Sequence, residues 1–248
     1  MNNITLHIER DYDALSKKAA EIFAASVKPD PTRAFGFATG GTMEGVYSEL
    51  VKMHKVGLAD FSRLMAYNLD EYHIIDPAHE QSYNYYMANR LFDAVGLPQE
   101  NRNIPLGNSS NPQEEAVAYD EKVISANIKM QLLGIGHNGH IAFNEPSDSF
   151  RAQTGHVALA EATIQNNARF FESADDVPRH AISMGIKTIM MAESILLLAS
   201  GESKAPILWD ALKGLITPLV PASVLQLHRN VIVVADLAAA KHLAASNS

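Results

Sequence analysis

Cysteine is absent from the 248 residues of the chain, which excludes disulfide bonds and thiolate chemistry. Long apolar runs are absent too, because none approaches the ~20 residues that a membrane-spanning helix requires. The first residues, which read MNNI, lack the basic segment and apolar core of a secretory signal peptide. We therefore expect a cytoplasmic protein that has no membrane as a partner.

Positive charge is scarce, since 20 lysine and arginine residues stand against 28 aspartate and glutamate residues and leave a net charge of −8. Nucleic acids select basic protein surfaces, so we expect no nucleic-acid partner. A small phosphorylated ligand needs only one local cationic pocket and stays compatible with this charge. The chain is otherwise ordinary in composition, with 47% hydrophobic and 19% charged residues, and its length allows one large α/β domain or two small ones.

Short apolar segments alternate along the chain with segments in which apolar residues recur at helical spacing. The apolar segments predict strands at residues 4–8, 34–38, 64–68, 131–135, 180–184, 194–200 and 231–235, and a weaker one at 103–106. The periodic segments predict helices at residues 12–27, 43–54, 82–95, 112–126, 187–191, 204–212 and 237–244. This alternation predicts a single α/β domain over residues 1–248, with an open, mostly parallel, Rossmann-like sheet and helices on both faces.

One long stretch departs from this alternation. Residues 147–163 are polar and show little periodicity, and the segment 165–171 that follows carries Arg169, an isolated cation beside two phenylalanines. A segment without regular periodicity next to a site is typical of a mobile loop. We interpret the region around residues 147–171 as a lid.

Two strand ends present groups that suit an anion. Thr39, Gly40, Gly41 and Thr42 lie between a predicted strand and a predicted helix, where glycines let the backbone approach closely and the free N–H groups of the helix point at a ligand. Glycine pairs also serve simply to turn the chain, so this motif alone is weak. Lys204 stands at the start of another predicted helix, where a cation opposes the helix dipole unless an anion lies between them.

Two further strand ends present groups that suit proton transfer. Asp70 and Glu71 follow the strand at 64–68, the place where a general base would lie, although a helix cap or a solvated acidic turn fits the same local pattern. The strand at 131–135 is followed by a segment dense in polar groups, namely His137, Asn138, His140, Asn144 and Glu145. Parallel strands place their carboxyl ends at one edge of a sheet, so all these groups can converge there.

A metal site is not indicated by these residues. His137 and His140 are three residues apart on a predicted loop, and the carboxylate-rich surroundings of a metal cage are missing. The residues by themselves therefore predict an enzyme without metal or cofactor that acts on a sugar phosphate by proton transfer.

Six segments resemble the glucosamine-6-phosphate deaminase (isomerase) family, in particular its short branch with asparagine at position 138. They occur in the family's order over nearly the whole chain, and the third of them is highly specific: residues 39–42 (TGGT), 68–72 (NLDEY), 134–146 (GIGHNGHIAFNEP), 168–171 (ARFF), 201–204 (GESK) and 223–228 (SVLQLH). The resemblance implies conversion of glucosamine 6-phosphate to fructose 6-phosphate and ammonia without a cofactor.

The resemblance also implies roles for single residues. Asp70 would move a proton from C2 to C1 of the open-chain sugar, His140 would open the ring, and Glu145 would orient His140. Many family members have aspartate where Asn138 stands; an asparagine there can still accept a hydrogen bond from the imidazole N–H and fix its tautomer. The 6-phosphate would be held by Thr39, Gly40, Gly41, Thr42, Arg169 and Lys204.

Regulation is expected to differ from that of the larger relatives. The hexameric family members bind N-acetylglucosamine 6-phosphate between subunits through basic residues, and the corresponding positions here are Gly155 and Val157. Neither residue can pair with a phosphate. We therefore expect no activator site, and a monomer or a homo-oligomer as the assembly.

Three alternatives remain open at this point. One hydroxyl group separates glucosamine 6-phosphate from galactosamine 6-phosphate, and nothing in the sequence decides between them. A 6-phosphogluconolactonase would share the fold and a glycine-rich loop, but it would lack the Asp-Glu-Tyr segment at 70–72 and the Phe-Asn-Glu-Pro segment at 143–146. A non-catalytic sugar-phosphate sensor would have no use for Asp70, His140 and Glu145 together.

Overall fold

A computed structural model describes residues 3–168, 171, 173 and 176–245, and its centre is a seven-stranded sheet. The strand order is β1-β10-β9-β6-β2-β3-β5, and every pairing in this sheet is parallel. The strands are β1 (Ile4–Glu9), β2 (Ala34–Phe37), β3 (Met65–Asn68), β5 (Arg102–Asn103), β6 (Met130–Gly134), β9 (Ile195–Ala199) and β10 (Val231–Asp236). This confirms the predicted open parallel α/β sheet within one domain.

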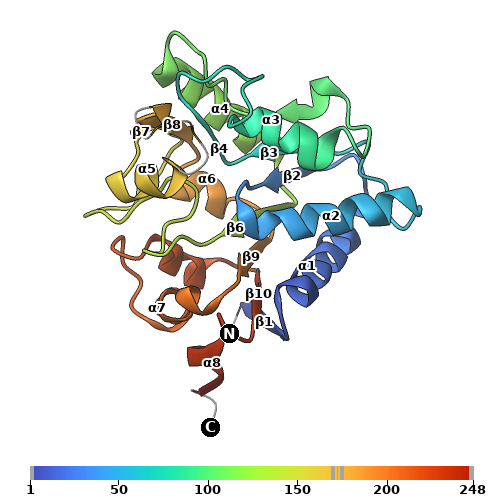
Figure 1. Ribbon diagram of the computed structural model, residues 1–248, viewed down its shortest axis with the longest axis vertical. Helices are drawn as coiled ribbons and strands as arrows, with labels where there is room; N and C mark the ends of the chain where they lie inside the picture. Colours follow the sequence, from blue (N-terminus) through green and yellow to red (C-terminus); the bar gives the residue numbers. More distant parts are fainter. Residues whose placement is uncertain (1–2, 169–170, 172, 174–175, 246–248) are drawn as a thin grey trace.

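Helices cover both faces of this sheet (Figure 1). On one side lie α1 and α2, and on the other lie α6 and α7. The α-helices are α1 (Tyr12–Val27), α2 (Gly41–Lys55), α3 (Tyr83–Met87), α4 (Pro112–Ala126), α5 (Glu161–Ala168), α6 (Ile186–Met190), α7 (Ala205–Lys213) and α8 (Lys241–Ala245). Short 3₁₀ segments span Gln99–Asn101, Glu202–Lys204 and Pro221–Leu227.

Local sequence explains where the longest helices begin and end. The carboxylate of Asp11 accepts the Ala14 N–H at 2.8 Å and caps α1, as expected of an aspartate at this position. In α4, Asn111 is the N-cap and Pro112 fills the first turn, where its missing N–H costs nothing. The same helix ends at Asn127, whose left-handed backbone has φ 51°, a conformation that asparagine tolerates.

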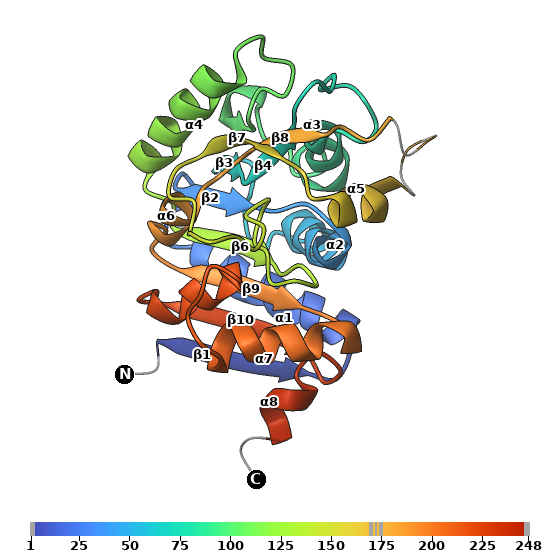
Figure 2. The same ribbon diagram turned by 90° about the vertical axis from the view of Figure 1, so that its left-hand side faces the viewer.

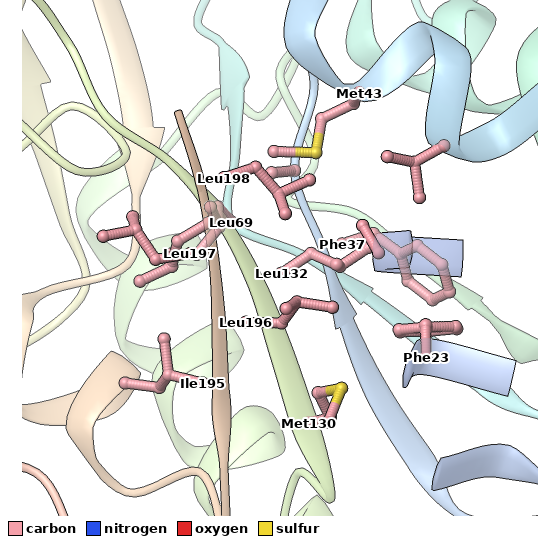
Figure 3. Packing of buried hydrophobic residues seen from close by; sticks show 14 of the residues in the cluster. Phe23, Phe37, Met43, Leu69, Met130, Leu132, Ile195, Leu196, Leu197 and Leu198 are labelled. Carbon is pink, nitrogen blue, oxygen red and sulfur yellow. The ribbon is translucent and has the colours of Figure 1, made fainter. Parts of the chain in front are cut away.

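The core consists of apolar side chains on both faces of the central strands. In Figure 3, Leu196 and Leu198 of β9 point to one side of the strand and Ile195 and Leu197 to the other, and all four are buried. Phe23 of α1 lies on the first of these sides. A central strand covered on both faces has no polar face, so β9 reads as an uninterrupted apolar run in the sequence.

A second, smaller sheet departs from the predicted topology. It has the order β4-β8-β7, with β4 (Asp70–Tyr72), β7 (Gly155–Ala158) and β8 (His180–Ser183), and both pairings are antiparallel. The predicted strand at 180–184 therefore exists but belongs to this sheet rather than to the main one. The reason is that a short apolar run specifies burial and not the strand with which it pairs.

Two further details differ from the prediction. The segment 82–95 is not one α-helix, because α3 continues as a π-helical turn over Ala88–Phe92. The segment 147–163 is not simply irregular, because it contains β7 and the start of α5. The sequence pattern did not predict β7, because this edge strand of the second sheet has four residues and these are too few to show an alternation.

The order of the main sheet identifies where a ligand should bind. From β2 the chain proceeds outward through β3 and β5, whereas from β6 it proceeds in the other direction through β9 and β10. Ligands of open α/β sheets bind outside the carboxyl ends of the strands at such a switch point. Figure 2 shows the strands side by side with α5 beyond the ends to which they point. The segments that follow β2 and β6 are thus neighbours at that edge.

Candidate active site

A cavity of about 410 Å³ opens at the carboxyl ends of the central strands. Its walls come from segments far apart in the sequence: the turn after β2, the start of β4, the turn after β6, and single residues of α3, α5 and the segment before α7. The sequence-predicted residues that line it are Thr39, Gly40, Gly41, Thr42, Asp70, Asn138, His140 and Lys204. The structure therefore brings together the groups that the sequence placed at separate strand ends.

One end of the cavity is the start of α2. Gly40 has φ 110°, a backbone conformation that residues with a Cβ rarely adopt. It is the N-cap of α2, and no side chain caps the helix there. The first turn of a helix carries N–H groups without partners inside the helix, together with the positive end of the helix dipole. This end of the cavity is therefore suited to an anion.

Lys204 brings a cation to the same cavity. Its ammonium group donates a hydrogen bond to the Ile135 carbonyl at 2.7 Å, and burial lowers the pKa of Lys204 below its usual value. Its positive charge, together with burial, also lowers the pKa of the neighbouring His137. An anion placed between Lys204 and the start of α2 would relieve both effects. Arg169, the other predicted phosphate ligand, lies outside the described residues.

The two adjacent carboxylates of β4 have different surroundings. Asp70 lines the cavity but is only 5% exposed. Burial and, to a smaller extent, the negative charge of Glu71 raise the pKa of Asp70 to about 8, against the opposing effect of the positive charge of Arg151. A carboxyl group with a pKa near neutrality can both accept and release a proton, as a general base must.

Glu71 instead holds the chain in place. Its two carboxylate oxygens accept the backbone N–H groups of Tyr72, Tyr83 and Asn84, each at 2.9 Å. Burial raises the pKa of Glu71 to about 7 in spite of these hydrogen bonds. The sequence left open whether this pair of carboxylates supplies a general base or caps a helix. In the structure Asp70 faces the cavity, where a base could act, and Glu71 caps the start of α3.

His140 lines the cavity, and Glu145, which lines a neighbouring pocket, lies beside it. The Nδ1 atom of His140 is 3.3 Å from the Glu145 carboxylate. Glu145 also accepts the Asn138 amide at 2.7 Å and the Thr163 hydroxyl at 2.7 Å. Burial alone would raise the pKa of Glu145, but the neighbouring His140 and these two donors outweigh it and lower the pKa to about 2. Glu145 is thus ionised and lies beside one nitrogen of the imidazole.

The contact expected for Asn138 is corrected by this geometry. In the described part of the chain, the Asn138 oxygen accepts the backbone N–H of His140 at 3.2 Å, and its NH₂ group donates to Glu145. The imidazole itself faces Glu145. The Asn138 side chain therefore holds the Glu145 carboxylate, which lies beside the His140 imidazole. It makes no hydrogen bond of its own to the ring in the described part of the chain.

The turn after β6 owes its shape to glycine. Gly139 has φ 84°, and Gly136 donates its N–H to the His140 carbonyl at 2.9 Å. This tight loop folds the His140 ring back over Gly136. It explains why the sequence places glycines between the polar residues of this segment.

Three residues of this region were not singled out from the sequence. Tyr83 and Thr163 line the cavity, and the Tyr83 hydroxyl interacts with Thr39 and Tyr72. Arg151 lies behind the cavity and acts electrostatically on Asp70. Tyr83 lies in the predicted helix at 82–95, whereas Thr163 and Arg151 stand in a stretch without periodicity. No sequence signal distinguished them.

The described residues form neither a metal site nor a membrane-spanning helix. Within residues 3–168 and 176–245, no group of three or more histidine or carboxylate side chains is arranged to hold a metal ion. No helix among the described residues is both long enough and apolar enough to cross a membrane.

The fold and the cavity define the class of protein. This is an open α/β enzyme with a cavity at the switch point of the sheet, where an end suited to an anion adjoins an end that carries titratable side chains. A model of the glucosamine-6-phosphate isomerases/6-phosphogluconolactonase family matches residues 10–234. The chain belongs to this family, which confirms the resemblance seen in the sequence.

Individual relatives agree with this assignment. A glucosamine-6-phosphate deaminase of Clostridioides difficile (strain 630) is 46% identical over 235 residues, which are 94% of each chain. The solved structure of a monomeric glucosamine-6-phosphate deaminase superposes with a TM-score of 0.92 at 41% identity and covers 96% of this chain and 99% of that one. A 6-phosphogluconolactonase from Trypanosoma cruzi has a TM-score of 0.78 at 16% identity, covers 96% of both chains, and shares the fold alone.

Proposed function

We propose that this chain converts glucosamine 6-phosphate and water to fructose 6-phosphate and ammonia without a cofactor. The observation that carries the proposal is Asp70, a buried carboxyl group whose pKa is raised to about 8 at the wall of a cavity that also holds His140 and Lys204. The two glucosamine-6-phosphate deaminases named above bear the same activity in their names and match almost the full length of the chain.

Binding of the phosphate orients the substrate. The 6-phosphate lies between Lys204 and residues 39–42, where the start of α2 and a buried ammonium face each other across the cavity. Arg169 completes this end in the proposal. Fixing the sugar at C6 places C1 and C2 at the other end, and a held substrate reacts as if at high effective concentration.

Ring opening is assigned to His140. The imidazole takes a proton from the anomeric hydroxyl and gives one to the ring oxygen, so the hemiacetal opens to the aldehyde with no net change in protons. The ionised Glu145 lies 3.3 Å from Nδ1 and stabilises the imidazolium that exists between the two transfers. The Asn138 amide and the Thr163 hydroxyl hold Glu145 in place.

Isomerisation is assigned to Asp70. Its carboxylate removes the proton at C2 while a proton from the C2 ammonium group passes to the C1 oxygen, which gives an enolamine, and the resulting acid returns the C2 proton to C1. The product is a protonated imine at C2, which adds water and releases ammonia as ammonium to leave fructose 6-phosphate. Burial of Asp70 at 5% exposure limits loss of the proton to solvent between these two steps.

The test is release of fructose 6-phosphate from glucosamine 6-phosphate by the wild type and by Asp70→Asn. The proposal predicts turnover by the wild type and a loss of about 10²–10⁴-fold in kcat for the variant, the usual contribution of a general base. Asp60→Asn, a change in an exposed carboxylate outside the cavity, is the control and should retain activity.

Assays with two other substrates distinguish the proposed function from its alternatives. Galactosamine 6-phosphate and 6-phosphogluconolactone are assayed alongside. Preference for the galacto sugar would move the assignment to its epimer, turnover of the lactone alone would contradict the deamination, and binding of sugar phosphates without any turnover would identify a sensor.

We also propose that the protein acts as a monomer, in the cytoplasm, without activation by N-acetylglucosamine 6-phosphate. The solved relative at 41% identity is described as monomeric, and Gly155 and Val157 stand at the positions where an activator phosphate would need cations.

A further inference from the structure

Arg151 connects the two titratable halves of the cavity from behind. One of its terminal nitrogens donates to the Asn144 side-chain oxygen at 2.8 Å and to the Met184 carbonyl at 3.3 Å. The other donates to the Ser183 carbonyl at 2.8 Å and to the Gln153 carbonyl at 2.9 Å. A planar guanidinium can satisfy such a set of acceptors at once because its N–H groups form a rigid fork.

One acceptor, the Asn144 side-chain oxygen, belongs to the His140–Glu145 turn. Asn144 precedes Glu145 and also donates to the carbonyls of Ile141 and Met184, at 2.9 and 2.8 Å. Without Arg151 the Asn144 oxygen would lose its partner in a buried place. The guanidinium therefore fixes the backbone from which Glu145 projects.

Another acceptor, the Ser183 carbonyl, belongs to the strand that pairs with Asp70. Ser183 of β8 is the residue opposite Asp70 of β4, and its hydroxyl accepts the Phe143 N–H at 3.1 Å. Arg151 thus bridges the segment that carries Glu145 and the strand pair that carries Asp70. A displacement of the Arg151 side chain would therefore change the positions of both Glu145 and Asp70.

The charge of Arg151 is unusual for a partly buried position. All four of its acceptors are neutral oxygens, and among the described residues no carboxylate lies within salt-bridge distance of it. Burial lowers the pKa of Arg151 to about 10, and the charges of Asp70 and Asp120 oppose that fall. The side chain is therefore a cation at neutral pH. The Asp120 carboxylate is already engaged by Thr154 and Thr188.

Several groups surround Asp70, and they act in different directions. Glu71 on the same strand is a like charge. Tyr119 of α4 is buried and Tyr83 of α3 is partly buried, and desolvation raises the pKa of both phenols well above 10, so they are neutral at physiological pH. His140 and Lys204 line the same cavity. Of the described groups that act on the pKa of Asp70, Arg151 is the one that lowers it.

We propose that Arg151 is a positioning residue of this active site, which locks the Phe143–Glu145 turn onto β8 and keeps a positive charge behind the Asp70 carboxylate. The proposal rests on the proposed function, in which Asp70 is the base. It assigns to one side chain two separable effects, one through hydrogen bonds and one through charge.

Two variants separate these effects. Arg151→Gln removes the charge, so the acid limb of the pH profile of kcat/KM should move upward by about one unit, with roughly tenfold lower activity at pH 7 that is largely regained near pH 9. Arg151→Lys keeps the charge but loses the fork, so it should lower kcat with a much smaller movement of the limb. KM should change little in both.

Arg102→Gln is the matched control. Arg102 is also a half-buried arginine, and its guanidinium donates to the Leu97 carbonyl and pairs with Asp93, but it does not act on Asp70. Its loss should leave the acid limb in place. An unchanged limb in Arg151→Gln would overturn the charge effect, and an unchanged kcat in Arg151→Lys would overturn the hydrogen-bond effect.

A direct titration keeps the proposal testable if turnover is absent or if a variant is unstable. The carboxyl carbon of Asp70 is followed by NMR with ¹³C-labelled aspartate and is assigned by its loss in Asp70→Asn. The pKa of Asp70 should be higher in Arg151→Gln than in the wild type. If the glutamine variant does not fold, Arg151→Lys is compared instead, and it should leave this pKa nearly unchanged.

Absent turnover together with these pKa results would contradict the proposed function and not the role of Arg151. An equal pKa in the wild type and Arg151→Gln, or a large rise in Arg151→Lys, would contradict the role of Arg151 itself.

Discussion

At the scale of single residues, Gly136 decides where the His140 imidazole can lie. A Cβ atom added at Gly136 would be 2.3 Å from Cε1 of His140 and 2.4 Å from both ring nitrogens. No side chain can approach another so closely, so any larger residue must displace the ring. The imidazole would then move from the carboxylate of Glu145, now 3.3 Å away.

Gly136→Ala should therefore lower kcat by about 10²-fold, the effect expected when a reacting group is misplaced by about 1 Å. The measurement is steady-state kinetics, with thermal unfolding to show that the variant folds. Gly134→Ala is the comparison, because its added Cβ would be 3.6 Å from the nearest atom, Met43 Cε, which is ordinary contact; it should lower kcat much less. Equal kcat values for Gly136→Ala and the wild type would show that His140 does not need this position.

At the scale of elements, β4 is three residues long and carries two carboxylates with different surroundings. Asp70 faces the cavity, whereas Glu71 accepts three backbone N–H groups at the start of α3. Burial raises the pKa of both, to about 8 and about 7. The folded protein therefore keeps protons on this strand that the unfolded chain releases near pH 4.

This difference makes β4 a source of instability at working pH. A carboxyl group whose pKa is raised by folding stabilises fully below its unfolded pKa, and that contribution is lost as pH rises through the folded value. Asp70→Asn should accordingly unfold at a higher temperature than the wild type at pH 8, by about 2–4 °C for each kcal/mol relieved, and the difference should shrink toward pH 4.

Thermal unfolding from pH 4 to 8.5 provides the measurement for this prediction. Asp60→Asn is the control, because hydrogen bonds from Ser62 lower the pKa of Asp60 and its loss should give no stabilisation at high pH. A lower unfolding temperature for Asp70→Asn at pH 8 would contradict the account. The expected gain in stability with loss of activity is the usual trade-off at a strained active site.

The strands differ in how well the sequence predicted them. Apolar runs such as residues 131–135 and 194–200 predicted strands of the main sheet, because burial on both faces requires such runs. β4 and β7 were missed, since three or four residues at the edge of a small sheet carry no periodicity. The glycine-rich turns and Asp70 were found because glycines and polar groups at strand ends are conspicuous in the sequence.

Pairings between side chains were harder to predict than positions. Glu145 was expected beside His140 and lies there, but Asn138 was expected on the imidazole and instead holds Glu145. Thr163 and Arg151 were not recognised at all, because their partners are 18 and up to 33 residues away in the sequence. Such contacts arise from the way that the second sheet packs against the turn after β6, which local pattern does not encode.

At the scale of the whole molecule, β7 is the edge strand of the second sheet and carries the positions of the activator contacts. Gly155 and Val157 are only partly exposed and bring no charge. The cation nearest to Gly155 is Arg151, whose Nη1 would be 3.2 Å from a Cβ at that position, but its N–H groups are committed to Gln153, Ser183, Asn144 and Met184. This edge therefore has no free described cation with which to bind a phosphate.

A protein without that contact lacks this route for coupling subunits through an activator, because an effector shifts an equilibrium only by binding one state better than another. We expect a sedimentation coefficient that corresponds to one chain of 27.0 kDa, and a hyperbolic dependence of velocity on glucosamine 6-phosphate that N-acetylglucosamine 6-phosphate leaves unchanged. Analytical ultracentrifugation and initial rates, each with and without the acetylated sugar, provide the two measurements. A sigmoidal curve that becomes hyperbolic on its addition would show that cations elsewhere on the chain form an activator site, and β7 would then have no part in regulation.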